Sequence, residues 1–280
     1  REMSLSVGSV AALLSLIENA YMPIAIFNVL YVQYRLDRAA YARFEAFLDS
    51  RDDERLALGI SPGDGIGELC IRNLSFQYEG REILCQVSLS VKDGEKVALV
   101  GESGSGKSTL IRLITGLLKY RTGQILLGGQ ELKELCLDKL YDRICYFSQD
   151  TPVFDGSLRE NVVFDRSVPD RQILDALRSV QLSCLTEGAG MGLDMQIGEK
   201  GTCLSGGEKQ RLALARLWFT DPELVILDEA TSAMDNLTEE AVMGAVLGRL
   251  RDKTVLAIAH RLSSIADFDR ILVFRDGRIV

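Results

Sequence analysis

The longest hydrophobic stretch of the chain lies near its start. In residues 10–32 the strongly polar positions are Ser15, Glu18, Asn19 and Asn28. A helix over this stretch would be roughly 35 Å long at about 1.5 Å per residue, which is enough to cross a bilayer. An acidic residue at mid-membrane costs on the order of 2.5–3.5 kcal/mol, so the polar positions predict a helix that faces other helices or a watery cavity. A buried helix of a soluble protein is the alternative interpretation.

The helical pattern continues beyond this stretch. Hydrophobic residues recur at helical spacing at Leu36, Ala40, Phe44 and Phe47. The basic residues that follow the apolar stretch place this side of a membrane span in the cytoplasm, and they are Arg35, Arg38 and Arg43. We therefore predict that residues 1–50 form the last transmembrane helix of a membrane domain with its cytoplasmic extension, kinked at Pro23. The composition changes abruptly over residues 51–67, which indicates a linker and a domain boundary.

From residue 68 onward, short strand-like and helix-like segments alternate. Strands are predicted at residues 69–76, 83–91, 96–100, 144–147, 224–227, 254–259 and 271–274, with a strand pair around 123–129. Helical patterns mark residues 110–114, most of 158–185, and 237–250. The alternation predicts an α/β domain over residues 68–280, with a helical subdomain at about 150–215. Because the sequence stops just after a predicted strand, we expect the domain to be truncated at its C-terminus.

Composition narrows the possible partners. The chain has 280 residues, with 32 basic and 40 acidic side chains and a net charge of −8. A nucleic-acid partner is not expected, because a protein that binds a duplex normally needs a basic face. The six cysteines form no C-x-x-C pair and do not cluster with the single histidine. We interpret them as reduced, buried thiols and not as disulfides or zinc ligands.

A glycine-rich segment at residues 101–109 carries the first chemical signal. Its sequence, GESGSGKST, matches the phosphate-binding pattern G-x-x-x-x-G-K-[ST] and follows an apolar strand. Backbone N–H groups of such a loop converge on phosphate oxygens, and the following helix directs its positive end at the same anion. Lys107 is expected to reach the β- and γ-phosphates, and Ser108 to ligate Mg²⁺. The predicted ATP-binding residues of this loop are Gly101, Ser103, Gly104, Ser105, Gly106, Lys107, Ser108 and Thr109.

Two carboxylates end a later hydrophobic segment. Residues 224–227 are four apolar residues, and Asp228 and Glu229 follow them directly. A buried parallel strand delivers such acids at its C-terminal edge, where nucleotide sites form. Asp228 is expected to hold Mg²⁺, directly or through water, and Glu229 to polarise the water that attacks the γ-phosphate. An apolar strand that ends in two acids is common by itself, and the phosphate loop upstream is what favours a functional role.

The segment at residues 204–211, LSGGEKQR, gives the assignment its specificity. Together with the phosphate loop before it and the acidic strand after it, this segment resembles the signature sequence of the ATP-binding cassette (ABC) family. The resemblance implies an α/β, P-loop NTPase domain of the ABC type, with a mixed-sheet core, an antiparallel β-subdomain and a helical subdomain. It also implies that two cassettes face each other, so that each ATP lies between the phosphate loop of one and this segment of the other. The residues expected to contact ATP in trans are Ser205, Gly206, Gly207, Glu208 and Asp235.

The resemblance extends to further positions in chain order. Tyr78 matches the aromatic residue that stacks on adenine, with Ile83 as an apolar neighbour. Gln149 matches a glutamine that contacts Mg²⁺ and the attacking water, and His260 matches a histidine that contacts the γ-phosphate. A structural or surface role is the ordinary alternative for each. Met234 stands where the family usually has leucine, a departure that preserves volume. The catalytic residues implied are Lys107, Gln149, Glu229 and His260, and the Mg²⁺ ligands implied are Ser108, Gln149 and Asp228.

Two segments resemble the exporter-type members of the family. Residues 151–162 resemble a segment typical of exporter cassettes, and residues 197–201 resemble a loop that exporters use against intracellular helices, with Glu199 as the contacting acid. They imply a half-transporter in the plasma or inner membrane, multi-pass in the full-length protein, with its cassette in the cytoplasm. The cofactors expected are ATP and Mg²⁺, and the partner expected is a second half-transporter, in a homodimer or a heterodimer. Peptides, lipids, drugs and thiol compounds all stay open as the substrate.

Two other functions explain part of the pattern. A soluble ABC-type ATPase, or an importer ATPase subunit without a fused membrane domain, would share every cassette motif, but the apolar N-terminal helix favours the exporter. A P-loop kinase would explain the phosphate loop but gives no account of the LSGGE segment.

Overall fold

The computed structural model describes residues 7–49, 54–56, 58–63, 65–187, 192–198, 203–259, 261 and 265–280. The chain divides into two units, Arg1–Asp53 and Glu54–Val280.

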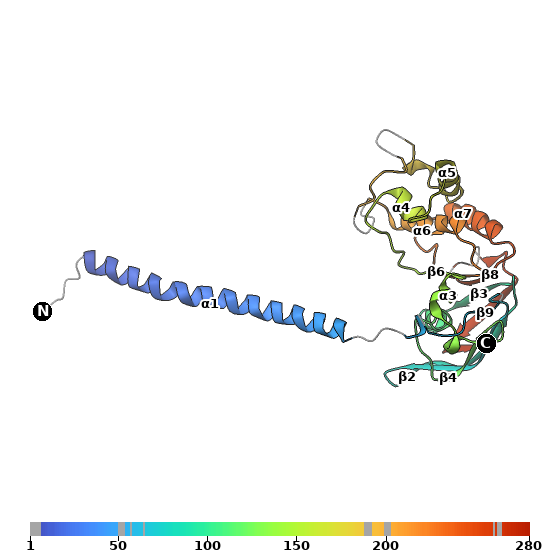
Figure 1. Ribbon diagram of the computed structural model, residues 1–280, viewed down its shortest axis with the longest axis horizontal. Helices are drawn as coiled ribbons and strands as arrows, with labels where there is room; N and C mark the ends of the chain where they lie inside the picture. The colour runs from blue at the N-terminus through green and yellow to red at the C-terminus, as the bar shows by residue number, and fades with distance from the viewer. Residues whose placement is uncertain are drawn as a thin grey trace. The chain divides into compact units, whose positions relative to one another are not determined.

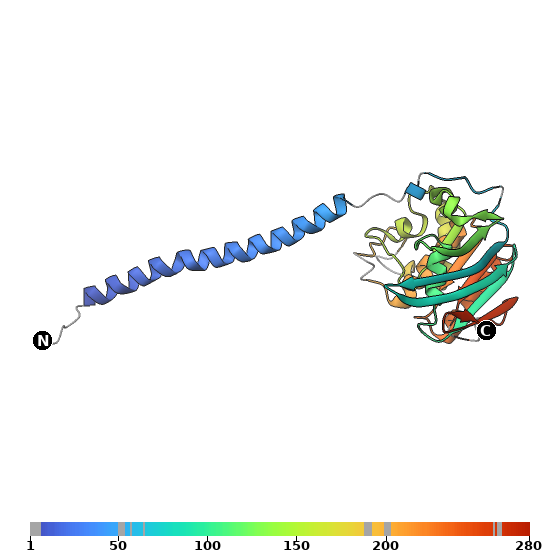
Figure 2. The same ribbon diagram turned by 90° about the horizontal axis from the view of Figure 1, so that it is seen from below.

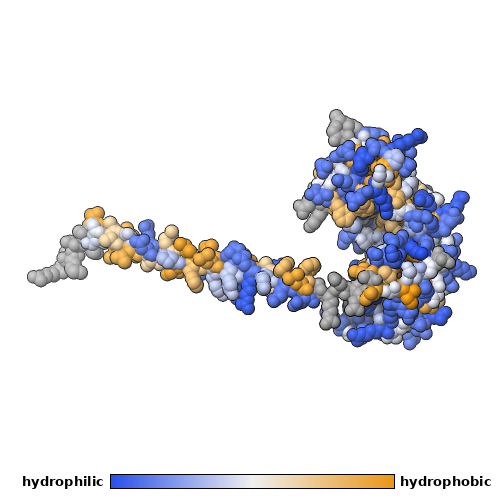
Figure 3. All heavy atoms as spheres, viewed as in Figure 1, coloured by the Kyte–Doolittle hydropathy of each residue, from blue (hydrophilic) through white to orange (hydrophobic). Residues whose placement is uncertain are grey.

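The described residues of the first unit, 7–49, form one long helix. α1 (Val7–Leu48) has 42 residues and runs without interruption through Pro23. Its large hydrophobic side chains lie on the surface, as Figure 3 shows along its length. The side-chain amide of Asn19 donates a 3.5 Å hydrogen bond to Ser15 Oγ, so two of the predicted polar residues lie one turn apart on the same face. Among the described residues, α1 is the one helix long and apolar enough to cross a membrane.

The described residues of the second unit form two β-sheets, whose arrangement can be followed in Figure 1 and Figure 2. The antiparallel sheet has the order β2-β1-β4-β5, and its strands are β1 (Leu69–Tyr78), β2 (Arg81–Val91), β4 (Thr122–Leu127) and β5 (Gln130–Glu131). The mixed sheet has the order β10-β9-β3-β8-β7-β6, and its strands are β3 (Lys96–Gly101), β6 (Ile144–Phe147), β7 (Leu224–Asp228), β8 (Thr254–Ile258), β9 (Arg270–Arg275) and β10 (Arg278–Ile279). Its strands pair in parallel except for β10, which is antiparallel to β9.

The described helices of the second unit fall into two groups, which pack in different hydrophobic cores. α2 (Lys107–Ile114) and α3 (Leu137–Tyr141) lie with the sheets. A second lobe contains α4 (Leu158–Val163), α5 (Asp170–Ser179), α6 (Gly206–Ala215) and α7 (Asn236–Arg249), as Figure 1 shows. Four 3₁₀ turns complete the described elements, namely η1 (Glu54–Leu56), η2 (Leu132–Glu134), η3 (Ser183–Leu185) and η5 (Arg216–Phe219). The predicted helical region 158–185 is divided because Phe164 has a positive φ of 54°, which ends α4.

β7 lies between two hydrophobic cores. Val225 and Leu227 belong to the core shared with the helical lobe, and Leu224 and Ile226 to the core between the two sheets and α2. Successive side chains of a strand point to opposite faces, so this strand is apolar at every position before its end. All five of its residues are buried. The first polar side chains that β7 offers to a site are therefore those at its C-terminal end.

Residues 58–63 and 65–67, part of the predicted linker, belong to the second unit. The backbone N–H of Ile60 donates to Glu134 O at 2.7 Å, and its carbonyl accepts from Cys136 N at 2.9 Å. Further along, Gly63 O accepts a 2.7 Å hydrogen bond from the Arg143 guanidinium. Ile60 therefore forms backbone hydrogen bonds with residues about 75 positions later in the chain. These bonds fix the segment that precedes β1 on the second unit.

We expect Gly59→Ala to destabilise the second unit. Gly59 has a φ of +145°, and a Cβ there would lie 2.6 Å from the backbone nitrogen of Cys136. The free energy of unfolding should fall by about 1–3 kcal/mol in urea titrations of the chain in detergent. Gly63→Ala is the matched control in the same segment, because its Cβ would come no closer than 3.7 Å to Gln130 Oε1. Equal losses from the two substitutions would contradict this close approach.

Candidate active site

The phosphate-loop sequence forms the turn between β3 and α2. Gly101 has a φ of +151°, and a Cβ there would lie 2.2 Å from the carbonyl oxygen of Phe274. Gly106 has a φ of +107°, and its Cβ would lie 2.8 Å from Leu84 Cδ2. Both positions therefore require glycine for conformation and for space. Gly106 is also the N-cap of α2 and gives it no side-chain cap, so the first N–H groups of this helix are left for a ligand.

Lys107 holds this loop in shape. Its ammonium donates 2.8 Å hydrogen bonds to the carbonyl oxygens of Gly101 and Glu102, and a 3.3 Å hydrogen bond to Ser105 Oγ. The residue is 5% exposed, and burial lowers the pKa of Lys107, although the nearby Glu229 and Asp228 oppose that shift. The phosphate loop thus surrounds the ammonium group of Lys107, and Lys107 also lines the pocket where a phosphate is predicted to bind.

Ser108 and Asp228, both predicted to bind Mg²⁺, lie within hydrogen-bond distance of each other. Ser108 Oγ donates a 3.2 Å hydrogen bond to Asp228 Oδ1, and Tyr146 Oη donates a 3.3 Å hydrogen bond to Asp228 Oδ2. Burial raises the pKa of Asp228, whereas these two hydrogen bonds oppose the shift. Burial, with the adjacent Asp228 charge, raises the pKa of Tyr146 to about 12, so its hydroxyl stays a donor. Sequence reasoning missed Tyr146, because only the pairing of β6 with β7 places it there.

Glu229 completes the same pocket. A cavity of about 360 Å³ is lined by Arg81, Ile83, Ser103, Gly104, Gly106, Lys107, Ser108, Thr109 and Glu229. Six of the eight predicted phosphate-loop residues, all but Gly101 and Ser105, therefore line one pocket together with the predicted base Glu229 and the predicted apolar neighbour of adenine, Ile83. A hydroxyl and a carboxylate at the edge of such a space suit Mg²⁺, which takes one or two protein oxygens and completes its shell with phosphates and water. Ser108 and Asp228, two of the predicted Mg²⁺ ligands, are the side chains that would hold it.

The LSGGE segment lies at a different place on the chain. Ser205 is the N-cap of α6, and its side chain forms a capping box with Glu208. Glu208 Oε2 accepts from Ser205 N at 2.8 Å and from Ser205 Oγ at 2.6 Å, which lowers the pKa of Glu208. Gly206 lines a second hollow, and none of residues 205–208 is among the described residues around the phosphate loop. In the described part of the chain, then, Gly206 and Lys107 line two different pockets.

Other predicted residues lie outside the phosphate-loop pocket. Gln149 lines the hollow of about 660 Å³ that also includes Gly206. Asp235 is the N-cap of α7, where its Oδ1 accepts a 3.0 Å hydrogen bond from Thr238 N, and this bond lowers the pKa of Asp235. His260 and Glu199 lie outside the described residues.

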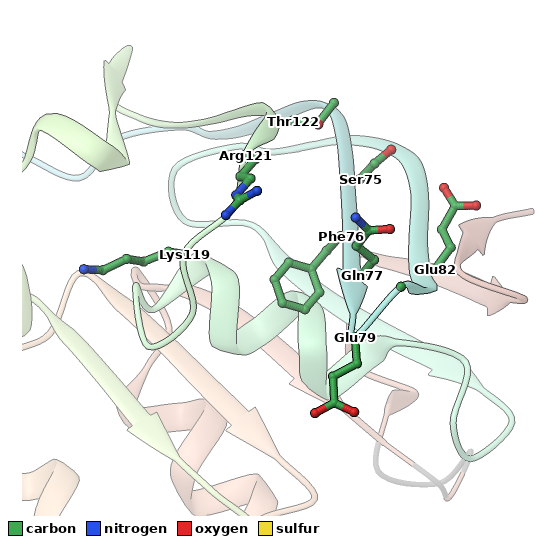
Figure 4. Close-up of a pocket in the computed structure, with 9 residues that line it drawn as sticks. Ser75, Phe76, Gln77, Glu79, Glu82, Lys119, Arg121 and Thr122 are labelled. Carbon is green, nitrogen blue, oxygen red and sulfur yellow. The ribbon is translucent and has the colours of Figure 1, made fainter. Parts of the chain in front are cut away.

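Tyr78 lies at the end of β1, where it is 40% exposed. Its ring makes an edge-to-face contact with Phe76, with 4.9 Å between the ring centroids. Figure 4 shows that Phe76 projects into a hollow of about 440 Å³ beside the β1–β2 hairpin. Glu82 lines this hollow, whereas Arg81 and Ile83 line the phosphate-loop pocket, so β2 separates the two spaces. None of the predicted site residues is among the described residues around the hollow of Figure 4.

A model of the ABC transporter family matches residues 84–232, which include the phosphate loop, the LSGGE segment and the acidic strand. The chain belongs to the ABC transporter family. The family and the ABC-type fold predicted from the sequence are thus confirmed.

Known ABC proteins resemble almost the whole chain. An uncharacterized ABC transporter ATP-binding protein of Bacillus subtilis is 36% identical over 279 residues, which cover 99% of this chain and 48% of the relative. A putative multidrug export ATP-binding/permease protein of Staphylococcus aureus is 35% identical over 281 residues, covering 99% and 49%. A mitochondrial iron-sulfur clusters transporter of Kluyveromyces lactis is 41% identical over 216 residues, covering 76% and 30%.

A solved structure of a bacterial Atm1-family ABC exporter with ATP bound also matches, with a TM-score of 0.75 and 29% identity. The match covers 99% of this chain and 49% of that chain. The chain thus spans about half the length, or less, of these ABC proteins.

We expect Phe76→Ala to weaken ATP binding through Tyr78. An edge-to-face aromatic pair contributes about 0.5–1.5 kcal/mol, so the Kd for ATP should rise about 2- to 10-fold when the support for Tyr78 is removed. Equilibrium binding of a fluorescent ATP analogue would measure the change. Gln77→Ala is the matched control, because Gln77 lines the same hollow and is not the ring that contacts Tyr78. An unchanged Kd for Phe76→Ala, with a raised Kd for Tyr78→Ala, would contradict this supporting role.

Proposed function

We propose that this chain is the ATP-hydrolysing part of an ABC exporter. Three observations support the proposal: the family match, the likeness to proteins named as exporters or export permeases, and α1, which has the length and hydropathy of a membrane span. In this proposal α1 crosses the plasma or inner membrane as one helix of a larger membrane domain, and the cassette lies in the cytoplasm. A soluble ABC-type ATPase would have no use for a helix with such an apolar surface.

The proposal rests on one observation above all: Lys107, Ser108 and Glu229 line one pocket, and buried Asp228 accepts a hydrogen bond from Ser108 beside it. In the proposed reaction, the loop N–H groups and Lys107 hold the β- and γ-phosphates of ATP. Ser108 and Asp228 would hold Mg²⁺, which would supply positive charge to neutralise the phosphate oxygens. Glu229 orients a water molecule for in-line attack on the γ-phosphorus and accepts its proton, while the bond from this phosphorus to the bridging oxygen of ADP breaks.

The second half of each site comes from another cassette in this proposal. Ser205, Gly206 and Gly207 open α6, whose N-terminal N–H groups suit a phosphate, yet they lie outside the pocket of their own phosphate loop. A second half-transporter that faces the first would bring these residues to the γ-phosphate. Closure over ATP and reopening after hydrolysis would then move the membrane helices between access states.

Two mixed dimers test this shared site. Chains with Lys107→Ala and with Ser205→Asp would be co-expressed with different affinity tags, and the dimer that carries both would be purified through the two tags. Asp keeps the N-cap of α6 while placing a negative charge against the phosphate. One composite site in this dimer is intact, so we expect ATPase activity of up to about half of the wild-type rate, measured as phosphate release.

The matched control carries the same two substitutions on one chain and pairs it with a wild-type chain. Both composite sites then contain one defect, so this dimer should be nearly inactive. If the control is the active dimer and the first one is not, each site is built from a single chain and the proposed function of α6 is wrong.

A further inference from the structure

Gln210, which the predicted chemistry does not use, makes three hydrogen bonds away from its own helix. Its Nε2 donates to Ser232 Oγ at 3.0 Å and to Glu229 O at 3.4 Å, and its Oε1 accepts from Ala233 N at 3.0 Å. The residue lies on the second turn of α6 and is 5% exposed. Both amide donors and one acceptor position are therefore used inside the protein.

The start of α6 is seated directly on the loop that Gln210 contacts. A Cβ on Gly207 would lie 2.9 Å from the carbonyl oxygen of Ala233, and a Cβ on Gly206 would lie 3.4 Å from Ala233 Cβ. Gly207 therefore permits a close approach between helix and loop, whereas the distance at Gly206 is an ordinary van der Waals contact. The same loop leads to Asp235, the N-cap of α7. A displacement of α6 would therefore displace this loop as well.

The third contact of Gln210 reaches the backbone of the proposed base. Glu229 has a φ of 54°, a conformation that residues other than glycine seldom adopt and that surrounding contacts must hold. Its N–H donates to Ile258 O at 3.3 Å, and its carbonyl accepts from Ser232 N at 3.1 Å and from Gln210 Nε2 at 3.4 Å. Among these three hydrogen bonds to the Glu229 backbone, the one from Gln210 comes from a side chain of α6. The direction of the Glu229 carboxylate depends on the backbone that these bonds fix.

We propose that Gln210 is a positioning residue that joins the start of α6 to the backbone of Glu229 and to the loop before Asp235. The inference rests on the proposed function, in which α6 and Glu229 of one chain serve two different ATP molecules. In one chain, Ser205 contacts the ATP bound by the partner's phosphate loop, whereas Glu229 acts on the ATP bound by the chain's own loop. Binding of the partner's γ-phosphate at Ser205 then affects Glu229 of the same chain through α6 and the Gln210 amide. Each chain thereby links the two composite sites of a dimer.

Two substitutions of similar size test the donor and acceptor functions of the Gln210 side-chain amide. Gln210→Glu removes both donors and keeps an acceptor for Ala233 N, and Gln210→Met removes all three hydrogen bonds without adding charge. We expect both variants to lower kcat for ATP at saturation by about 10-fold or more, with the Kd for ATP changed less than about 2-fold. Circular dichroism melting of both variants in detergent would be followed alongside phosphate release and binding of a fluorescent ATP analogue.

The pH profile distinguishes positioning from general damage to the fold. Burial raises the pKa of a carboxyl group, so the acid introduced by Gln210→Glu gains a proton as pH falls and becomes a donor again. The ratio of the kcat of Gln210→Glu to that of wild type should therefore increase several-fold as the pH is lowered from 8 to 6. The same ratio for Gln210→Met should stay flat, because its side chain does not titrate. Gln172→Glu, on the exposed surface of α5, is the control for the charge change and should leave kcat unaltered.

The outcomes that overturn the inference are distinct from those that overturn the proposed function. If wild type hydrolyses ATP, Glu229→Gln does not, and a folded Gln210→Met keeps a normal kcat, then Gln210 does not position the base. Equal pH profiles for the two Gln210 variants, with losses of kcat that match losses of folded protein, would also reduce Gln210 to a structural residue. If wild type itself shows no hydrolysis, or if Glu229→Gln keeps it, the proposed function is what fails.

Discussion

The burial of β7 on both faces is the constraint on which the site depends. A strand enclosed by two hydrophobic cores has no room for a polar side chain until it ends, and there Asp228 and Glu229 emerge together. β3 runs parallel to β7 with β8 between them, so the phosphate loop leaves the sheet at the same edge. The meeting of Ser108 with Asp228, 120 residues later in the chain, follows from this strand order.

The C-terminal end of β7 also connects the sheets to the helical lobe formed by α4–α7. Glu229 is bonded on one side to β8 through Ile258 and on the other to the helical lobe through Gln210. The network around α7 adds to this connection, because buried Glu239 accepts from Thr231 Oγ1 at 2.7 Å and pairs with the Arg261 guanidinium. The end of one strand is thus tied to helices that, in the proposed dimer, face another nucleotide.

Local sequence was enough to predict the phosphate loop and the acidic strand, because glycine spacing and an apolar run that ends in two acids leave few other structures. It was not enough for contacts that depend on which strands become neighbours. Tyr146 reaches Asp228 only because β6 pairs with β7. Likewise the glycines and charges of residues 51–67 indicated a boundary, but the pairing of Ile60 with Leu135 depends on tertiary neighbours that composition does not reveal.

In the proposed dimer, one chain supplies only half of each ATP site. The most direct measurement is an electron cryomicroscopy structure of the Glu229→Gln variant with ATP and Mg²⁺, since slowed hydrolysis should hold the closed state. The result predicted is a pair of cassettes in which each γ-phosphate lies between Lys107 of one chain and Ser205 of the other. A γ-phosphate contacted by Lys107 and Ser205 of the same chain, or a saturated cassette that stays unpaired, would contradict the claim.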